Sequence, residues 1–574
     1  MTSIEAGRPL GEVLTRRQRW FLLVSLMLAM FVGAIDQTVV GTATPKILAD
    51  LGGFNLLAWL FTSYMLSSTV IVPLVGKMSD IYGRKMFVIA GIMIFMLSSA
   101  ACGAAPTMFT LIVFRAVQGI GGGMIFASVF SSIGDIFPPA ERAKYMGLFT
   151  GTFSLASILG PTVGGFLTDH GNGLLGVDSG WRWVFYINVP FSLVAIPAIW
   201  FNLPSRHGTG RPKIDFLGAA LLSIASVVAL LAFEWAGKNY AWASPQIIGL
   251  FVAAVVFVGL FILQEARHDE PILPLHLFRN RTFVLANVIV FALGMGMFGA
   301  LQYLGIFVQT ALGASATASG VISTPQSAGM LVASIISGQL IARTGRYRVQ
   351  TILGAIVILA AMLLLRTIDI GIEKWHISGY MVVLGVGFGL VMPTMSLAVQ
   401  NAVPYKYLGV ASSSSQFFRQ IGSVFGIAIF AVILTSSYES SFSDKLPAAD
   451  RAQMETLPGK PLDAFEDPTL SLNPVLFGSV QKQVLSLDGG KEILARATAA
   501  QRESVASATQ DIFTGATAVA VICVLLCMLL KEVPLRRDFK MAAPAGAPDP
   551  EAADGGDSRG AEAQIPSPGP AIGH

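Results

Sequence analysis

Hydrophobic residues in this chain of 574 residues come in long, nearly uninterrupted blocks, not in the alternation or narrow stripes typical of soluble domains. A helix of about 20 apolar residues is long enough to cross the roughly 30 Å hydrocarbon core of a bilayer. The blocks predict fourteen such helices, at 20–44, 56–75, 86–105, 108–132, 145–168, 183–203, 214–236, 246–264, 283–310, 317–342, 349–366, 377–400, 407–436 and 508–530. The predicted fold class is therefore an all-α integral membrane protein.

The composition agrees with a protein immersed in lipid. Hydrophobic residues make up 53% of the chain and charged residues only 13%, and the mean hydropathy is +0.66. A soluble domain usually carries about 25% charged residues, so a soluble fold is excluded. The 59 glycines lie mostly inside the apolar blocks, where small residues allow close helix packing in lipid.

The three cysteines, Cys102, Cys523 and Cys527, lie in apolar helical stretches. Cys523 and Cys527 are four residues apart and share a helix face, but no His, Asp or Glu lies near them in the sequence. We therefore predict that they are packing residues and that no metal is bound. The N-terminal apolar block is too long for a cleavable signal peptide.

Basic residues mark one side of the membrane. Lys and Arg gather in alternate connections, as they do in the short cytoplasmic loops of membrane proteins. The main members of this set are Arg16, Arg17, Arg19, Lys77, Arg84, Lys85, Arg142, Lys144, Arg206, Arg211, Lys213, Arg267, Arg279, Arg281, Arg343, Arg346, Arg348, Lys406, Lys531, Arg536 and Arg537. The pattern predicts a multi-pass protein of the cell (inner or plasma) membrane with both termini cytoplasmic. The net charge of +4 is explained by these loops, so no nucleic-acid partner is predicted.

Three segments fall outside the predicted spans. Residues 1–19 form a cytoplasmic N-terminus, and 541–574, rich in Ala, Pro, Gly and Asp, is expected to be a disordered cytoplasmic tail. Residues 437–507 are expected to form a long external loop. The last part of that loop, 491–507, has the pattern of a helix leading into the final span.

Three sequence matches between the two parts of the chain indicate an internal duplication. The segment 76–85 recurs at 338–347, 262 positions later; 159–164 recurs at 421–426, also 262 positions later; and 119–123 recurs at 385–389, after 266 positions. We predict two six-helix halves, 20–203 and 283–530, with two extra central helices over 214–264. Because both halves start from the same side, the repeat is parallel and predicts a central cavity between the halves.

The motifs along the chain resemble those of the major facilitator superfamily, and within it the fourteen-helix drug:proton antiporters of the multidrug efflux type. The resemblance rests on Gly76–Lys85 after the second helix, Arg115–Gly121 in the fourth, Gly160–Gly165 in the fifth, Leu28–Pro45 in the first, and Trp181–Pro190. It covers roughly 20–436 and the last span.

This resemblance implies a proton-coupled antiporter that exports drugs or other amphipathic small molecules by alternating access. It would act as a monomer in the lipid bilayer, contribute to antibiotic resistance, and need no cofactor besides the proton gradient. An exporter of an endogenous lipid, siderophore or metabolite is the alternative. An enzyme is less favoured because the histidines lie in loops, at span ends or in the tail, and a membrane receptor because no large folded cytoplasmic domain is expected. The chain has no Walker-type phosphate loop, so transport driven by a nucleotide is not expected.

Asp36 is the main candidate for proton coupling. It lies inside an apolar span, where a carboxylate is energetically expensive and usually functional. Burial favours its protonated form and a nearby cation favours the carboxylate, so a group held between these influences can bind and release a proton. Arg115 lies at matched depth and is the expected counter-charge. Two other interpretations stay open: a static ion pair between helices, and direct binding of a cationic substrate.

The loop after the second helix is a candidate cytoplasmic gate, made of Gly76, Asp80, Gly83, Arg84 and Lys85. The glycine at 83 permits a tight turn, and Asp80 and Arg84 can form a charge network that breaks as the halves rock. A fixed anchor loop is the simpler interpretation. The second copy has Ala342 in place of Asp80, so any gate is asymmetric.

The antiporter motif in the fifth helix contains Gly160, Pro161, Gly164 and Gly165. Proline removes a backbone donor and the glycines allow close packing. The resemblance implies a hinge or a tight seal between the halves, and a simple kink is the alternative.

Polar, aromatic and Met side chains of the spans are candidates for an adaptable substrate cavity: Asp36, Trp59, Tyr64, Gln302, Gln326, Met395, Gln400 and Arg419. Arg419 has no obvious acidic partner at equal depth. It either faces the cavity and favours anionic or zwitterionic substrates, or it snorkels or pairs with a carbonyl.

Overall fold

The computed structural model describes residues 14–53, 56–204, 215–237, 239–457, 460–533 and 535. Residues 1–13 of the expected N-terminal segment and the whole expected tail 541–574 lie outside this described part. Within it the chain is helical, and its one extended pairing is a single bridge between Ala236 and Tyr240.

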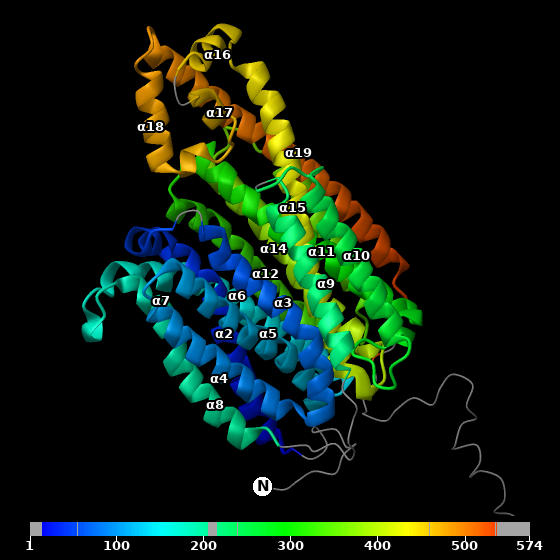
Figure 1. Ribbon diagram of the computed structural model, residues 1–574. Helices are drawn as coiled ribbons and strands as arrows, with labels where there is room; N and C mark the ends of the chain where they lie inside the picture. Colours follow the sequence, from blue (N-terminus) through cyan, green and yellow to red (C-terminus); the bar gives the residue numbers. More distant parts are fainter. Residues whose placement is uncertain are drawn as a thin grey trace, which may run out of the picture.

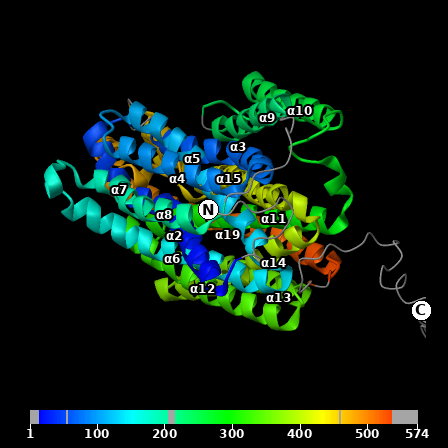
Figure 2. The same cartoon turned by 90° about the horizontal axis from the view of Figure 1, so that it is seen from below.

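The long helices form two groups that lie side by side, with the blue N-terminal group next to the green-to-red C-terminal group (Figures 1 and 2). The N-terminal half contains α2 (Arg16–Leu51), α3 (Leu57–Tyr82), α4 (Arg84–Gly103), α5 (Met108–Ile136), α6 (Pro139–His170), α7 (Trp183–Tyr186) and α8 (Asn188–Asn202). The C-terminal half contains α11 (Arg281–Thr310), α12 (Ala316–Thr344), α13 (Arg348–Leu365), α14 (Lys374–Asn401), α15 (Leu408–Lys445) and α19 (Gly490–Leu529). The short helices α16 (Ala448–Glu455), α17 (Pro461–Phe465) and α18 (Pro474–Val484) lie between α15 and α19.

Two further helices, α9 (Phe216–Trp235) and α10 (Pro245–Glu265), form a hairpin at the edge of the bundle (Figure 2). The hairpin packs along the seam where α3 of one half meets α15 of the other. Phe233 of α9 lies against Phe425 of α15, with ring centroids 4.3 Å apart. The insertion predicted over 214–264 is therefore a peripheral hairpin and leaves the paired halves adjacent.

Thirteen helices in the described part of the chain are long and apolar enough to cross a membrane. The helix α12 is not among them because Ser, Thr, Gly and Gln are frequent in it, but it has 29 residues and packs between α6 and α14. Its position in the bundle makes it the fourteenth long helix. The predicted all-α architecture with two six-helix halves and two extra helices describes this arrangement.

Glycines set the spacing of the paired helices at several contacts. On α15, Gly422 and Gly426 lie directly on the backbone of α11 at Phe291 and Met295, so that a Cβ at either position would collide with a carbonyl oxygen. Close approach of this kind replaces the hydrophobic driving force that is missing between helices in lipid. The glycine-rich composition of the spans thus has a direct structural use.

The basic loops share one end of the bundle, which we call the basic end. It carries the connection between α3 and α4, with Lys77 and Lys85, and the starts of α2, α6 and α15. The helices α16, α17 and α18 lie at the opposite end, together with the outer parts of α15 and α19 (Figure 1). We call residues 437–507, which form this second feature, the cap.

The segment expected as a long external loop over 437–507 is largely helical in its described residues, and the helix expected over 491–507 is the first part of α19. The helix α15 continues to Lys445, and α19 begins at Gly490, so that both spans extend far beyond the bundle. Tyr438 donates a hydrogen bond to the Phe465 carbonyl at 2.6 Å, and Arg496 forms two bonds to Asp450, at 2.6 and 2.8 Å. Buried apolar residues, including Met454, Val484 and Ile493, complete a small core.

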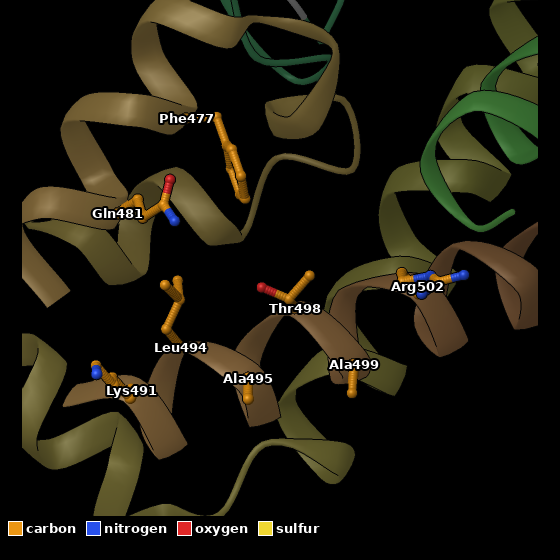
Figure 3. A pocket seen from close by; sticks show the side chains of 8 residues that line it. All are labelled: Phe477, Gln481, Lys491, Leu494, Ala495, Thr498, Ala499 and Arg502. Carbon is orange, nitrogen blue, oxygen red and sulfur yellow. The ribbon is translucent and has the colours of Figure 1, made fainter. Parts of the chain in front are cut away.

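A pocket of about 440 Å³ opens between α18 and α19 in the cap (Figure 3). Phe477 and Gln481 line it from α18, and residues of α19 from Lys491 to Arg502 line it from the other side. Arg502 itself is tied to the end of α11 through a hydrogen bond from its Nε to the Ala311 carbonyl, at 2.6 Å. The pocket belongs to the cap and not to the interface between the halves.

The contact between α15 and α11 generates a stability prediction. Replacing Gly426 by Ala forces the two backbones apart, and overpacking of this kind costs about 1–3 kcal/mol. We expect the purified Gly426→Ala variant to unfold several degrees below the wild type in a thermal fluorescence assay. The matched control is Gly379→Ala on α14, where a Cβ meets no atom within 4 Å. Equal melting temperatures for the two variants would contradict the packing argument.

Candidate functional site

Asp36 and Arg115 form an ion pair inside the N-terminal half. Asp36 lies on α2 and is fully buried, and Arg115 lies on α5 and is 2% exposed. The Arg115 Nη1 is 2.6 Å from the Asp36 Oδ2. The contact expected from matched depth is therefore present, and the Asp36 side chain points into the protein and not toward lipid.

Two amides complete the coordination of the carboxylate. Gln118 Nε2 and Asn188 Nδ2 each donate to the Asp36 Oδ1 at 2.9 Å. The same two amides also donate to the Ser99 hydroxyl, at 3.0 and 2.9 Å. Residues of α5 and α8 therefore bind the carboxylate of α2 directly, and Ser99 of α4 joins the network through the two amides. We call Asp36, Ser99, Arg115, Gln118 and Asn188 the buried acid cluster.

Sequence reasoning missed three of these five residues as members of the site. Gln118 and Asn188 stand inside motifs that carry the family resemblance, but their side chains had no assigned role. The signal was the polarity of each residue within an apolar span. In lipid such a group needs a partner, and a carboxylate is a strong acceptor for an amide.

Arg115 is held by further contacts. Its guanidinium lies over the ring of Tyr64, 4.3 Å from the centroid, and its Nη1 also donates to Gln118 Oε1 at 2.8 Å. A cation over an aromatic face is attracted by the electron-rich ring, and the attraction is strengthened by desolvation. Tyr64, an expected cavity residue, thus covers the cation in this conformation.

The surroundings of Asp36 are all of one kind. Every group in contact with its two oxygens is a donor. Because the side chain is fully buried, water reaches these oxygens only if a neighbouring helix shifts.

A second network links the two halves at the basic end. Asp80 of α3 accepts hydrogen bonds from the backbone N–H groups of Gly409 and Val410, at 3.0 and 3.1 Å, at the start of α15. A carboxylate at a helix N-terminus is stabilised by the unpaired amides and the helix dipole. Arg84 pairs with Asp80 at 2.9 Å and also with Asp135 of α5. The acidic member of the predicted gate therefore bridges the halves.

The other residues of the gate motif support this bridge. Gly83 has a positive φ of 91° at the turn between α3 and α4. Gly76 lies against Gly409 and Ser413 of α15, where a side chain would collide. Lys85 turns away from the bridge and donates to the Trp200 carbonyl at 2.6 Å. Gly76 and Gly83 thus permit the approach that Asp80 uses, while Lys85 anchors α4 to α8.

Further hydrogen bonds join the halves from the basic end to mid-depth. Gln400 of α14 donates to the Phe130 carbonyl of α5 at 3.1 Å, and Ser334 of α12 donates to the Gly147 carbonyl of α6 at 3.1 Å. Deeper in the bundle, Thr69 of α3 donates to Gln420 of α15 at 2.5 Å. The expected cavity residue Gln400 is therefore part of the closed interface in this conformation.

The glycine motif of α6 makes its close contacts inside the N-terminal half. Gly160 lies against Thr38 of α2, and Gly164 lies against Val39 and Thr42. The expected seal between the halves is wrong for this conformation, because these two glycines face α2, whereas a different part of α6 packs on α12. Gly165 faces open space, and Pro161 lies within the continuous helix α6. The motif thus packs α6 against the segment of α2 next to Asp36.

The expected cavity residues are spread over several environments. Met395 is fully buried in the C-terminal core and Gln326 is 4% exposed, whereas Gln302 is exposed on α11 and Trp59 is partly exposed near the start of α3. Arg419 is half-buried on α15, and its Nε donates to Gln416 Oε1 at 2.9 Å. The structure brings Asp36 and Tyr64 together around Arg115 but does not gather the whole set.

No cluster of three or more potential metal ligands occurs in the described ranges, and the three cysteines are buried and unpaired. Cys102 lies next to the buried acid cluster, with its Sγ 3.6 Å from Gln118 Oε1. The role expected for the cysteines, packing among apolar neighbours, fits their surroundings.

Comparison with known proteins gives a consistent family signal. The family model described as Major Facilitator Superfamily matches residues 26–427. The multidrug transporter protein MdtP of Bacillus subtilis is 43% identical over 75% of this chain and 78% of its own length. Multidrug resistance protein 3 of the same organism is 36% identical over 74% and 81%. The acurin A biosynthesis cluster MFS-type transporter of Aspergillus aculeatus is 30% identical over 91% and 90%.

Solved structures show a similar fold at low sequence identity. The human organic anion transporter MFSD10 (TETRAN) has a TM-score of 0.56 and 14% identity, covering 89% of this chain and 99% of that one. The proton:xylose symporter XylE has a TM-score of 0.54 and 14% identity, covering 75% and 91%. These two matches support the arrangement of helices alone.

The buried acid cluster generates a prediction about Arg115. Removing the guanidinium leaves Asp36 buried without its counter-charge, and breaking such a pair costs about 3–5 kcal/mol. We expect Arg115→Ala to lower both the melting temperature and transport more strongly than Arg115→Lys, which keeps the charge. Thermal unfolding of the purified variants and dye transport in vesicles measure the two effects. Equal losses in the Ala and Lys variants would contradict a role for the charge.

Proposed function

The chain belongs to the major facilitator superfamily, and from this premise we propose that it is a proton-coupled antiporter that exports amphipathic small molecules. It is a multi-span transporter of small molecules and not an enzyme. In our proposal its cargo includes drugs, it works as a monomer in the cell membrane, and both termini and the basic end face the cytoplasm. The gradient of protons is its only energy source.

The single observation that carries the proposal is the buried acid cluster. A carboxylate that receives three donors from α5 and α8 is sensitive to protonation, because one proton removes the charge on which these three contacts depend. Protonation of Asp36 would free Arg115 and the two amides to rearrange. Uptake of a proton on one side of the membrane and its release on the other would then be coupled to movement of α2 and α5.

The glycine motif gives a path from this event to the interface. Gly160 lies against the Thr38 side chain of α2, and Gly164 lies against Thr42 and Val39, immediately after Asp36; α6 also packs along α12 of the other half. A shift of α2 would therefore be transmitted through α6 to the C-terminal half. Such close contacts transmit displacement well, because short side chains packed directly on glycine leave little room to absorb it.

The basic-end network supplies the gate in the proposed cycle. The bridge from Asp80 to the start of α15 closes the cytoplasmic side in the conformation described above. Opening to the cytoplasm would require this bridge and the Gln400 contact to break, while the opposite side closes. Such exchange between two arrangements of the halves is alternating access.

The second candidate function is export of an endogenous metabolite. This second candidate is favoured by the likeness over 91% of the chain to a transporter whose name places it in a biosynthesis cluster. The coupling mechanism would be the same, and only the ligand in the central site would differ. A panel of drugs and cell extracts tested against a deletion strain separates the two.

The proton-site assignment predicts that Asp36→Asn abolishes coupled efflux. The amide is nearly isosteric and still accepts hydrogen bonds, so the protein should remain inserted, but it cannot carry a proton. We expect gradient-driven transport of ethidium in inside-out vesicles to fall at least tenfold.

The matched control is Asp50→Asn, which changes a carboxylate on the same helix that accepts from Trp181 at 2.9 Å, outside the cluster. This control should respond to collapse of the pH gradient as the wild type does. If the Asp36→Asn variant also keeps its response to the gradient, Asp36 is a static structural residue and the proton-site assignment fails.

The gate assignment predicts that Asp80→Asn loosens the closed basic end. An amide caps the start of α15 more weakly than a carboxylate and does not pair with Arg84. We expect a cysteine introduced by Ser412→Cys, at a buried position on α15, to react several-fold faster with a water-soluble maleimide applied from the cytoplasmic side.

Asp135→Asn serves as the comparison, because Asp135 pairs with the same arginine from within the N-terminal half. It should raise the labelling rate less than Asp80→Asn. An equal or larger effect of Asp135→Asn would mean that the bridge from Asp80 to α15 does not close the gate.

A further inference from the structure

Arg419 lies on the face of α15 that is directed into the interface between the halves. Ser412, Gln416 and Arg419 are spaced four and three residues apart, so they share one helix face. Gln400 of α14 donates to Ser412 on this face at 2.9 Å. The next residue, Gln420, accepts the hydrogen bond from Thr69 across the interface. Arg419 therefore shares the face of α15 that carries Ser412 and Gln416, and its backbone packs on Gly294 of α11.

The depth of Arg419 places it well inside the membrane. Gly409, which contacts Asp80 at the basic end, lies ten residues earlier on the same helix, and this separation corresponds to about 15 Å. That distance is about half of the hydrocarbon thickness. A guanidinium at this depth is at the level where parallel-repeat transporters bind their cargo.

The charge of Arg419 is not balanced by the protein. Within the described ranges no carboxylate pairs with it, and its one hydrogen bond runs from Nε to Gln416. Asp36, which is also buried within a span, already has Arg115 as its partner. An unpaired cation at membrane depth is rare and marks a cavity, a pathway or a ligand site.

The free end of the guanidinium is not bound by any described residue. The Nη1 and Nη2 groups of Arg419 have no partner among the described residues, and they are not among the buried polar atoms sealed from solvent. By contrast, the Arg84 Nη1 at the basic end is sealed. The two Nη groups form the fork that binds a carboxylate, sulfonate or phosphate with two parallel hydrogen bonds.

From this geometry we infer that the transporter prefers anionic amphipathic cargo, with the anionic group bound end-on by the Nη1 and Nη2 of Arg419. Gln416 fixes the Nε side of the guanidinium, so the fork is already oriented before the cargo arrives. The inference rests on the proposed export function and names the class of cargo for its central site. It assigns Asp36 to the proton and Arg419 to the cargo, in separate halves.

The test uses two probes that differ in one charge. N-dansyl-phenylalanine carries a carboxylate, and its methyl ester has the same fluorophore and nearly the same size without the charge. Uptake of each into inside-out vesicles is measured under an imposed pH gradient, together with uptake of the cation ethidium. We expect the wild type to have a lower KM for the acid than for the ester.

The substitution Arg419→Gln should raise the KM for the acid relative to the KM for the ester at least tenfold. The substitution Arg419→Lys should keep part of the preference for the acid. The matched control is Arg366→Gln, the same change at an exposed arginine after α13, which should leave the ratio as in the wild type. The ratio of two KM values measured on one preparation does not depend on the fraction of the variant that folds. The Arg419→Lys variant tests the same position a second time, with the charge retained.

The outcomes separate the inference from the proposed function. An unchanged ratio in Arg419→Gln, or a wild type that prefers the ester or transports only ethidium, would overturn the inference and leave proton-coupled export intact. Transport of all three probes that ignores collapse of the pH gradient would instead overturn the proposed function. Loss of the acid preference in Arg419→Gln with partial recovery in Arg419→Lys supports the inference.

Discussion

The buried pairing of Asp36 with Arg115 is the interaction around which the N-terminal half is organised. A carboxylate in an apolar interior is tolerated only if donors surround it, and here the three donors come from two helices, α5 and α8. This one charge therefore ties α5 and α8 to α2, and Ser99 of α4 joins them through the same two amides. Any event that neutralises this charge weakens the ion pair and the hydrogen bonds that join those helices.

The two halves contribute unequal chemistry to a symmetric fold. The duplication gives both halves the same helix packing, including glycine contacts at equivalent places on α6 and α15. The acidic members, Asp36 and Asp80, belong to the first half, while the second half carries Arg419, which has no described carboxylate partner. The proposed roles of proton site and cargo site therefore fall in different halves of the repeat.

The sequence predicted the helices, the duplication and the pairing of Asp36 with Arg115, because each depends on periodic or long apolar patterns with isolated polar residues. Some features could not be predicted in this way. The partners Gln118 and Asn188 are contacts between distant segments, and the packing of Gly160 against α2 depends on which face of α6 is turned inward. The helix over 491–507 was predicted, but the short helices α17 and α18 were not, since helices of this length with Pro at their first turns have no long apolar block.

The attachment of the cap has a mechanical consequence. Its ties run to the C-terminal half, through Arg502 to the end of α11, Ser471 to Thr310, and the unbroken helices α15 and α19. In the proposed cycle the cap would move with the C-terminal half, so a small tilt at the midplane would become a large displacement at the far end of the cap. A pair of fluorophores on α18 and on the outer end of α2 would therefore report the conformational state of a single molecule without disturbing the interior.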